Sequence, residues 1–289
     1  MGKKRVVVSS SETTAVVVEQ LRGWEGLNPE ILALIFVRIP ADAMVRGVPF
    51  VCKPWMEVVA GPYCWHDIDV EAWCRRRDVS RAVDVDFVVK KLVRRSKFTV
   101  QRLSAYRLGE SGFFLVSICG RSLKVLQSPM SSITDYMVIK HIKPLPNLKL
   151  LDISHCYKIT HKGIAAFGNH CKSLIHLKRR MPPLLDEDCS PIDDSEAKTI
   201  ATTMVSLQRI ELCFGRFGDM GISEIVTKCK SLTHLDIEGS CNVELNYGDL
   251  KEICESLEHF RCPQIDYSDG FFDNDEASED VDSVSSIYD

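Results

Sequence analysis

Histidine and cysteine are the residues of this sequence most able to do chemistry, because imidazole and thiolate groups act as bases, nucleophiles and metal ligands. Three histidines, His176, His234 and His259, occupy the same position within a recurring short phrase. A row of imidazoles suggests a catalytic or metal-binding stripe. No nucleophile or carboxylate pattern accompanies them, so we predict a polar stripe with no catalytic residues.

The twelve cysteines predict packing more than metal binding. There is no Cys-x-x-Cys motif, and the pairs His155-Cys156 and His170-Cys171 are adjacent residues that cannot easily ligate one ion. A zinc site is the alternative. We predict no metal and no cofactor, with cysteines acting as small buried hydrophobes in a reducing compartment.

A leucine phrase of the type Ser-Leu-x-x-Leu must position these side chains. Its first positions are Val100, Leu123, Leu148, Leu174, Leu207, Leu232 and Leu257, in steps of 23, 25, 26, 33, 25 and 25 residues. A period in this range indicates a solenoid. Each phrase continues as an alternating strand, followed by a turn and an amphipathic helix. The step of 33 residues marks an insertion, from 178 to 188, that either contacts a ligand or remains an uninvolved loop.

The third and fifth positions of each phrase are predicted to face outward on a concave sheet, because strand residues alternate between two faces. About seven strands would form a surface roughly 30 Å long. This surface is either a binding site for a protein or simply the solvated side of the sheet. The candidate target-binding residues are Arg102, His176, Lys178, Arg209, Glu211, His234, Asp236, His259 and Arg261.

The segment 27–40 is predicted to be a helix with Asn28 as N-cap, Pro29 at the first position and Glu30 near its positive end. Apolar residues cover more than half of its surface, so it is either buried in a core or pressed against a partner. Two more short helices are predicted at 42–48 and 51–60. Pro54 is compatible with the last helix only in its first turn.

Together these residues resemble an F-box, the helical module of about forty residues that binds Skp-type adaptors of cullin–RING ubiquitin ligases. The proline of the usual Leu-Pro start is shifted by one place, to Pro29. The resemblance rests on Leu27, Pro29, Glu30, Ile35, Phe36, Ile39, Pro40, Val51, Cys52, Lys53, Trp55 and Trp65. The adaptor-binding residues that it implies are Leu27, Pro29, Glu30, Leu32, Ile35, Phe36, Ile39, Val51, Cys52 and Trp55.

The repeats resemble the cysteine-containing class of leucine-rich repeats, as in Cys156-Tyr-Lys-Ile-Thr160 and His170-Cys171-Lys-Ser-Leu174. An F-box followed by such repeats is similar to the plant F-box/leucine-rich-repeat proteins. The implied fold is α/β, a three-helix F-box followed by a short right-handed solenoid with parallel concave strands and convex helices. The implied role is a non-catalytic receptor that joins an unidentified target protein to the adaptor and, through it, to cullin and RING subunits.

A second interpretation remains: a ligase-independent scaffold whose helical head only caps the solenoid, since solenoids need caps. The expected organisation is a flexible N-terminus (1–22), the F-box (23–66), a helical linker or cap (67–98), about seven repeats (99–263) and an acidic disordered tail (264–289).

Charge and hydropathy bear on the compartment and on partners. No apolar run approaches the ~18 residues that span a bilayer, so we expect no membrane contact. Without the tail's nine acidic residues, the net charge of −4 becomes about +5. This positive charge is too small to predict nucleic-acid binding. Lys3-Lys4-Arg5 is a weak import signal, so we expect the nucleus, the cytoplasm or both.

Overall fold

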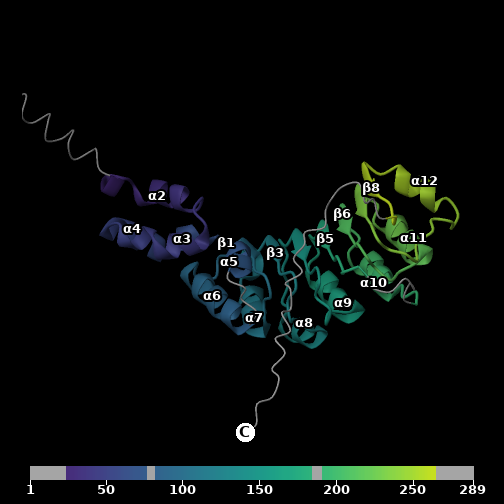
Figure 1. Ribbon diagram of the computed structural model, residues 1–289, viewed down its shortest axis with the longest axis horizontal. Helices are drawn as coiled ribbons and strands as arrows, with labels where there is room; N and C mark the ends of the chain where they lie inside the picture. The colour runs from purple at the N-terminus through teal and green to yellow at the C-terminus, as the bar shows by residue number, and fades with distance from the viewer. Residues whose placement is uncertain (1–23, 77–81, 184–190, 265–289) are drawn as a thin grey trace, which may run out of the picture.

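A computed structural model describes residues 24–76, 82–183 and 191–264. A group of short helices lies beyond one end of a curved sheet that is flanked on its outer side by helices (Figure 1). The expectations for segment 1–22, for the tail beyond Gln264, for Lys3–Arg5 and for Asp186–Asp188 fall outside the described residues.

The N-terminal part, which we call the head, contains the three predicted helices. The Asn28 side chain accepts a hydrogen bond from the Glu30 backbone N–H at 2.8 Å, as an N-cap does. Pro54 lies in the first turn of its helix, where a missing N–H is tolerated. The elements are η1 (Trp24–Gly26), α2 (Pro29–Phe36), α3 (Ala41–Arg46), η2 (Val48–Phe50), α4 (Lys53–Ala60) and η3 (Pro62–Trp65).

The body is built on one eight-stranded parallel sheet whose strands follow chain order. The third positions of successive phrases lie directly opposite one another, for example His176 beside Arg209. This confirms the predicted α/β solenoid. The strands are β1 (Asp67–Asp69), β2 (Arg102–Ser104), β3 (Val125–Gln127), β4 (Leu150–Asp152), β5 (His176–Lys178), β6 (Arg209–Glu211), β7 (His234–Asp236) and β8 (His259–Arg261).

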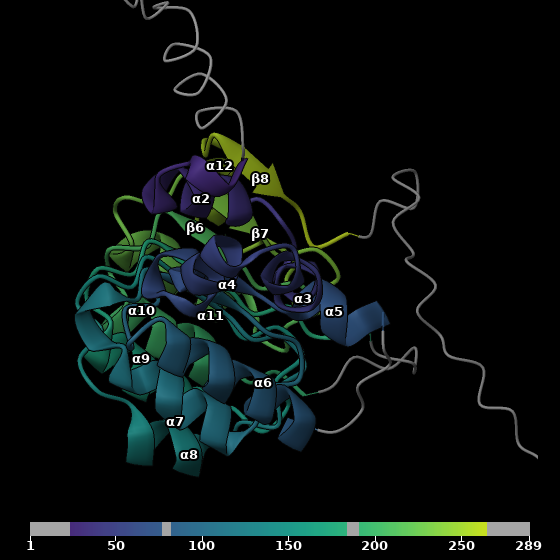
Figure 2. The same cartoon turned by 90° about the vertical axis from the view of Figure 1, so that its left-hand side faces the viewer.

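Helices cover the convex side of this sheet (Figure 1), and Figure 2 views the same arrangement from the head end. The core is a ladder of fourth-position residues, such as Leu151, Leu177 and Ile210, all fully buried. Among the described residues no helix is long and apolar enough to cross a membrane. The elements are α5 (Glu71–Arg76), α6 (Ala82–Arg95), α7 (Glu110–Ile118), η4 (Gly120–Ser122), α8 (Asp135–His141), α9 (His161–His170), α10 (Ser195–Thr203), α11 (Asp219–Lys228) and α12 (Leu250–Glu255).

The first strand was not expected from the leucine phrase. Strand β1 lies inside the segment predicted as a helical linker, and Asp67 pairs with Arg102 in the same register as later strands. Counting back from Asp67, Trp65 stands at the first position of the phrase, which is leucine in most later repeats. Trp65 is fully buried, and its indole N–H donates to the Val59 carbonyl of α4 at 2.8 Å. Trp65 therefore connects the head to the first unit of the solenoid.

A recurring aspartate–glycine contact joins successive convex helices. Asp135 at the start of α8 accepts hydrogen bonds from the backbone N–H groups of Thr160 and Gly163, at 2.8 and 2.9 Å. A Cβ on Gly163 would lie 2.6 Å from the Asp135 carboxylate. The same close approach joins Asp86 to Gly112 and Asp194 to Gly221, and each glycine is the third residue of its helix.

Most described cysteines pack as predicted. Ten carry free thiols, and eight of these are buried. Burial raises the pKa of the Cys171 thiol to about 12, so it remains a neutral packing group. Cys241 departs from the expectation of reduced thiols, because it is disulfide-bonded.

Candidate functional site

The head presents apolar side chains that the rest of the described chain does not cover. On α2, Ile31, Leu34 and Ile35 are exposed, while Leu32 and Phe36 turn inward. The exposed residues follow the i, i+3, i+4 spacing of one helix face. We define the head surface as the exposed apolar residues Ile31, Leu34, Ile35, Val37, Phe50, Val51 and Met56.

Part of the predicted adaptor set lies inside the head and not on its surface. Leu32 and Phe36 are each only 1% exposed, because they form the core between α2 and α4, so their side chains are not on the surface. Leu27, Ile39 and Trp55 are half-buried against the same core. Trp55 packs edge-on against Phe36 with ring centroids 5.0 Å apart.

The other predicted adaptor residues do lie on the surface. Pro29, Glu30, Ile35 and Val51 are exposed, and Cys52 is half-buried. Sequence reasoning left Leu34, Phe50 and Met56 out of the set, although all three are exposed apolar side chains. The sequence held a signal for Leu34, since Ile31 and Ile35 bracket it on the same helix face.

The second candidate surface is the concave face of strands β5 to β8. Predicted target residues from these strands meet there, but Glu211 is only 2% exposed and not on the surface as expected. Its Oε1 lies 3.0 Å from His176 Nε2, 3.1 Å from Arg209 Nε and 3.5 Å from Lys178 Nζ, and its Oε2 lies 3.1 Å from Arg180 Nε. Glu211 is buried because basic side chains close over it.

The charge state of Glu211 follows from these neighbours. Burial acts to raise its pKa, but the hydrogen bond from His176 and the charges of Lys178 and Arg180 lower the pKa to about 2. The carboxylate is therefore ionised throughout the physiological range, and it holds the surrounding basic groups in place.

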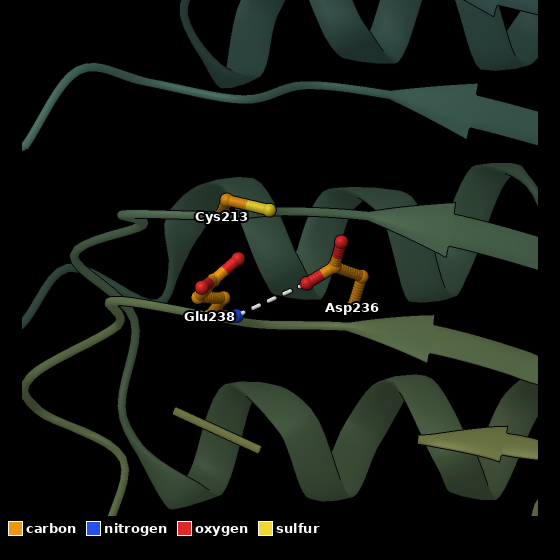
Figure 3. Close-up of side chains that lie close together, drawn as sticks. All are labelled: Cys213, Asp236 and Glu238. Atoms are coloured by element: carbon orange, nitrogen blue, oxygen red, sulfur yellow. Dashed lines mark hydrogen bonds between the residues drawn. The ribbon is translucent and has the colours of Figure 1, made fainter. Parts of the chain in front are cut away.

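A second ion-pair network lies beside the first. Asp236 is 3.1 Å from Arg180 Nη2, and Glu238 is 3.0 Å from Arg261 Nη1. Figure 3 shows Cys213 next to these two carboxylates, and the three ligand atoms lie within 4.8 Å of one another. Sequence reasoning did not predict this grouping, since its members come from different repeats.

This grouping has the residue types of a metal site, but its two carboxylates have basic partners. Burial, reinforced by Asp236, raises the pKa of the Cys213 thiol, so in the chain alone Cys213 is a neutral group. The two carboxylates are already matched by guanidinium groups. We therefore assign Cys213, Asp236 and Glu238 to the ion-pair network of the concave face.

The remaining predicted residue, Arg102, lies apart from this cluster on β2, with Asp67 at 3.8 Å. The histidines on β7 and β8 are closer than expected for isolated surface groups. The rings of His234 and His259 have centroids 4.3 Å apart. The predicted concave residues thus gather mainly at the C-terminal half of the sheet.

Comparison with known proteins gives the family. The chain is 36% identical over 234 residues to F-box protein FBW2 of Arabidopsis thaliana, covering 81% of this chain and 73% of that protein. The chain belongs to the F-box protein family. No family model matches it.

Other relatives of this F-box protein agree with both parts of the fold. F-box protein SKIP1 of Arabidopsis thaliana is 28% identical over 75% of this chain and 78% of that protein. Putative F-box/LRR-repeat protein 23 of the same plant is also 28% identical, over 85% of this chain and 54% of the relative. The F-box protein described here therefore resembles plant F-box and F-box/leucine-rich-repeat proteins over most of its length.

Proposed function

We propose that this F-box protein is a substrate-recognition subunit of an SCF-type (Skp–cullin–F-box) ubiquitin ligase. The head surface binds a Skp-type adaptor and, through it, cullin and RING subunits. The concave face holds a target protein, which is then ubiquitinated and degraded. We propose that it acts in the nucleus, the cytoplasm or both.

One observation carries this proposal: apart from Glu30 in its first turn, α2 is apolar, but only half of it is covered. Leu34 is 68% exposed at the centre of the uncovered face. Burying a leucine or isoleucine side chain contributes about 1.5–3 kcal/mol, so covering Ile31, Leu34 and Ile35 would supply much of the affinity of a protein complex. A partner helix or groove is the natural cover for such a face.

The proposed contribution to ubiquitination is proximity. A receptor that binds target and adaptor together turns the meeting of the acceptor lysine and the ubiquitin-conjugating enzyme into a nearly intramolecular event. The residues of the concave face supply binding, and the chemistry belongs to the other ligase subunits.

A ligase-independent scaffold is the alternative, with the head acting as an end cap. The burial of Trp65 beneath α4 favours this role for part of the head. It does not account for the head surface, since a cap gains nothing from exposing Leu34 and Phe50.

The proposal is tested by separating the two surfaces in plant cells. A Leu34→Asp/Ile35→Asp variant should lose the adaptor while still binding targets, so target proteins should accumulate on the variant and decline with the wild-type chain. Tyr136→Asp on α8 is the matched control, because Tyr136 is 67% exposed and lies on the body. If the wild-type chain and the Leu34→Asp/Ile35→Asp variant carried equal amounts of bound target proteins, the result would favour the scaffold.

A further inference from the structure

The four C-terminal strands carry a row of basic side chains on the concave face. Strand pairing places His176 beside Arg209, Arg209 beside His234, and His234 beside His259. We call these four residues the basic row. At about 4.8 Å between strands, it is roughly 14 Å long.

The row two residues further along the same strands has a different composition. It consists of Lys178, Glu211, Asp236 and Arg261, so its positive and negative charges balance. The basic row contains no acid of its own. Arg209 carries a permanent positive charge and the imidazoles offer ring nitrogens as hydrogen-bond donors, so an anion lying along the row would meet complementary groups.

Several donors of the basic row are free to bind such an anion. Glu211 occupies His176 Nε2 and Arg209 Nε, and Thr233 Oγ1 lies 2.7 Å from His234 Nδ1. Other nitrogens of the row have no hydrogen-bond partner within the described residues. These are Nη1 and Nη2 of Arg209, Nε2 of His234 and both ring nitrogens of His259. Arg209, His234 and His259 border a hollow of about 390 Å³, which Arg180 and Arg261 and their ion-pair partners Glu211 and Asp236 also line.

The surroundings of His234 link this surface to pH. Burial, the neighbouring His259 and Arg209, and more weakly His176, lower the pKa of His234, while Glu258 acts in the opposite direction. A carboxylate bound at the row would favour the protonated ring. Binding of an acidic ligand should therefore strengthen as the pH falls.

We infer that the basic row binds an acidic segment of an extended polypeptide, whose aspartate or glutamate carboxylates accept hydrogen bonds from Arg209, His234 and His259. This rests on the proposed function, since the segment belongs to the target held on the concave face. An extended chain rises about 3.3 Å per residue, so about four or five residues cover the row.

The experiment measures binding of a fluorescent peptide of alternating glutamate and serine to the full chain, without adaptor. Arg209→Gln should weaken binding about tenfold, the scale of one lost charge-assisted pair. Arg121→Gln is the matched control, because Arg121 is an exposed arginine on η4, outside the strands of the concave face. It should leave binding unchanged.

The inference would be overturned by no binding of the glutamate peptide, by equal binding of its glutamine counterpart, or by equal losses from Arg209→Gln and Arg121→Gln. Tighter binding of a single-stranded oligonucleotide than of the peptide would also overturn it. Leu34→Asp/Ile35→Asp should bind the peptide like wild type, so a failure here is distinguishable from a failure of adaptor binding.

The pH profile gives an independent readout. Peptide affinity should rise several-fold between about pH 7.5 and about pH 5.5, a range in which glutamate stays ionised and imidazole gains a proton. A His234→Gln/His259→Gln variant should show a flatter profile. An unchanged profile in that variant would contradict the role of the two rings.

Discussion

At the residue scale, Glu211 differs most from its sequence expectation. Its position in the phrase indicated a surface carboxylate, but basic side chains from β5 and β6 close over it. Such a group is a stability determinant as well as a charge on the binding face, because removing one member of a buried ion pair leaves the others uncompensated.

The pH dependence of stability tests this role. Since the pKa of Glu211 is about 2 when folded and near 4.5 when unfolded, its contribution is complete above about pH 4.5 and is lost as the pH falls toward 2. The difference corresponds to about 3 kcal/mol. Denaturation at about pH 6 and about pH 3 should therefore show a smaller acid-induced loss for Glu211→Gln than for wild type. Identical losses would contradict the assignment.

Trp65 is the second residue whose role came from packing. It fills the first position of a repeat unit while its indole N–H bonds to α4. Trp65→Ala should cost about 3–5 kcal/mol, the usual range for a buried aromatic residue, and should lower the melting temperature of the whole chain. Trp65→Phe keeps most of the ring and should cost less. Equal melting temperatures for all three chains would contradict this role.

At the element scale, the aspartate–glycine contacts set the spacing of the convex helices. Alanine normally stabilises a helix relative to glycine by about 1 kcal/mol. At Gly163 the added methyl meets the Asp135 carboxylate and Ile159, so Gly163→Ala should destabilise the chain by about 1–3 kcal/mol.

A double-mutant cycle checks that contact. With Asp135→Ala the carboxylate is absent, so Gly163→Ala should cost less in that background than in wild type. Additive losses, measured by chemical denaturation of the four chains, would mean that the two residues do not interact.

The elements also indicate what the sequence could and could not predict. The leucine phrase gave the correct register of seven strands, because its leucines point into one stacked core. It missed β1, where Trp65 stands in place of leucine. The sequence did not separate the two faces of α2, since Glu30 is its one polar side chain and lies in the first turn, so no polar face marks the exposed side.

At the scale of the whole molecule, the site depends on contacts between repeats that sequence spacing does not reveal. Glu211 and Arg180 are 31 residues apart, and Cys213 and Asp236 come from neighbouring units. The phrase predicted which positions face the concave side. The lengths and charges of side chains on neighbouring strands decide which concave-face residues form ion pairs and which keep unpaired hydrogen-bond donors.

The molecule carries two separate surfaces, the head surface and the basic row. The head lies beyond the β1 end of the sheet, and the basic row lies on strands β5 to β8 (Figure 1). Substitutions on one should leave ligand binding at the other unchanged, because sites far apart with no shared contacts act additively.

The most direct measurement of the central claim is the affinity of the purified chain for a purified Skp-type adaptor by calorimetry. Leu34→Asp should weaken binding by at least tenfold, since it places a charge on a desolvated apolar face. Tyr136→Asp should bind like wild type, and both variants should melt like wild type because each side chain is exposed. Equal affinities for all three chains, or no binding by a folded wild-type chain, would contradict the receptor role.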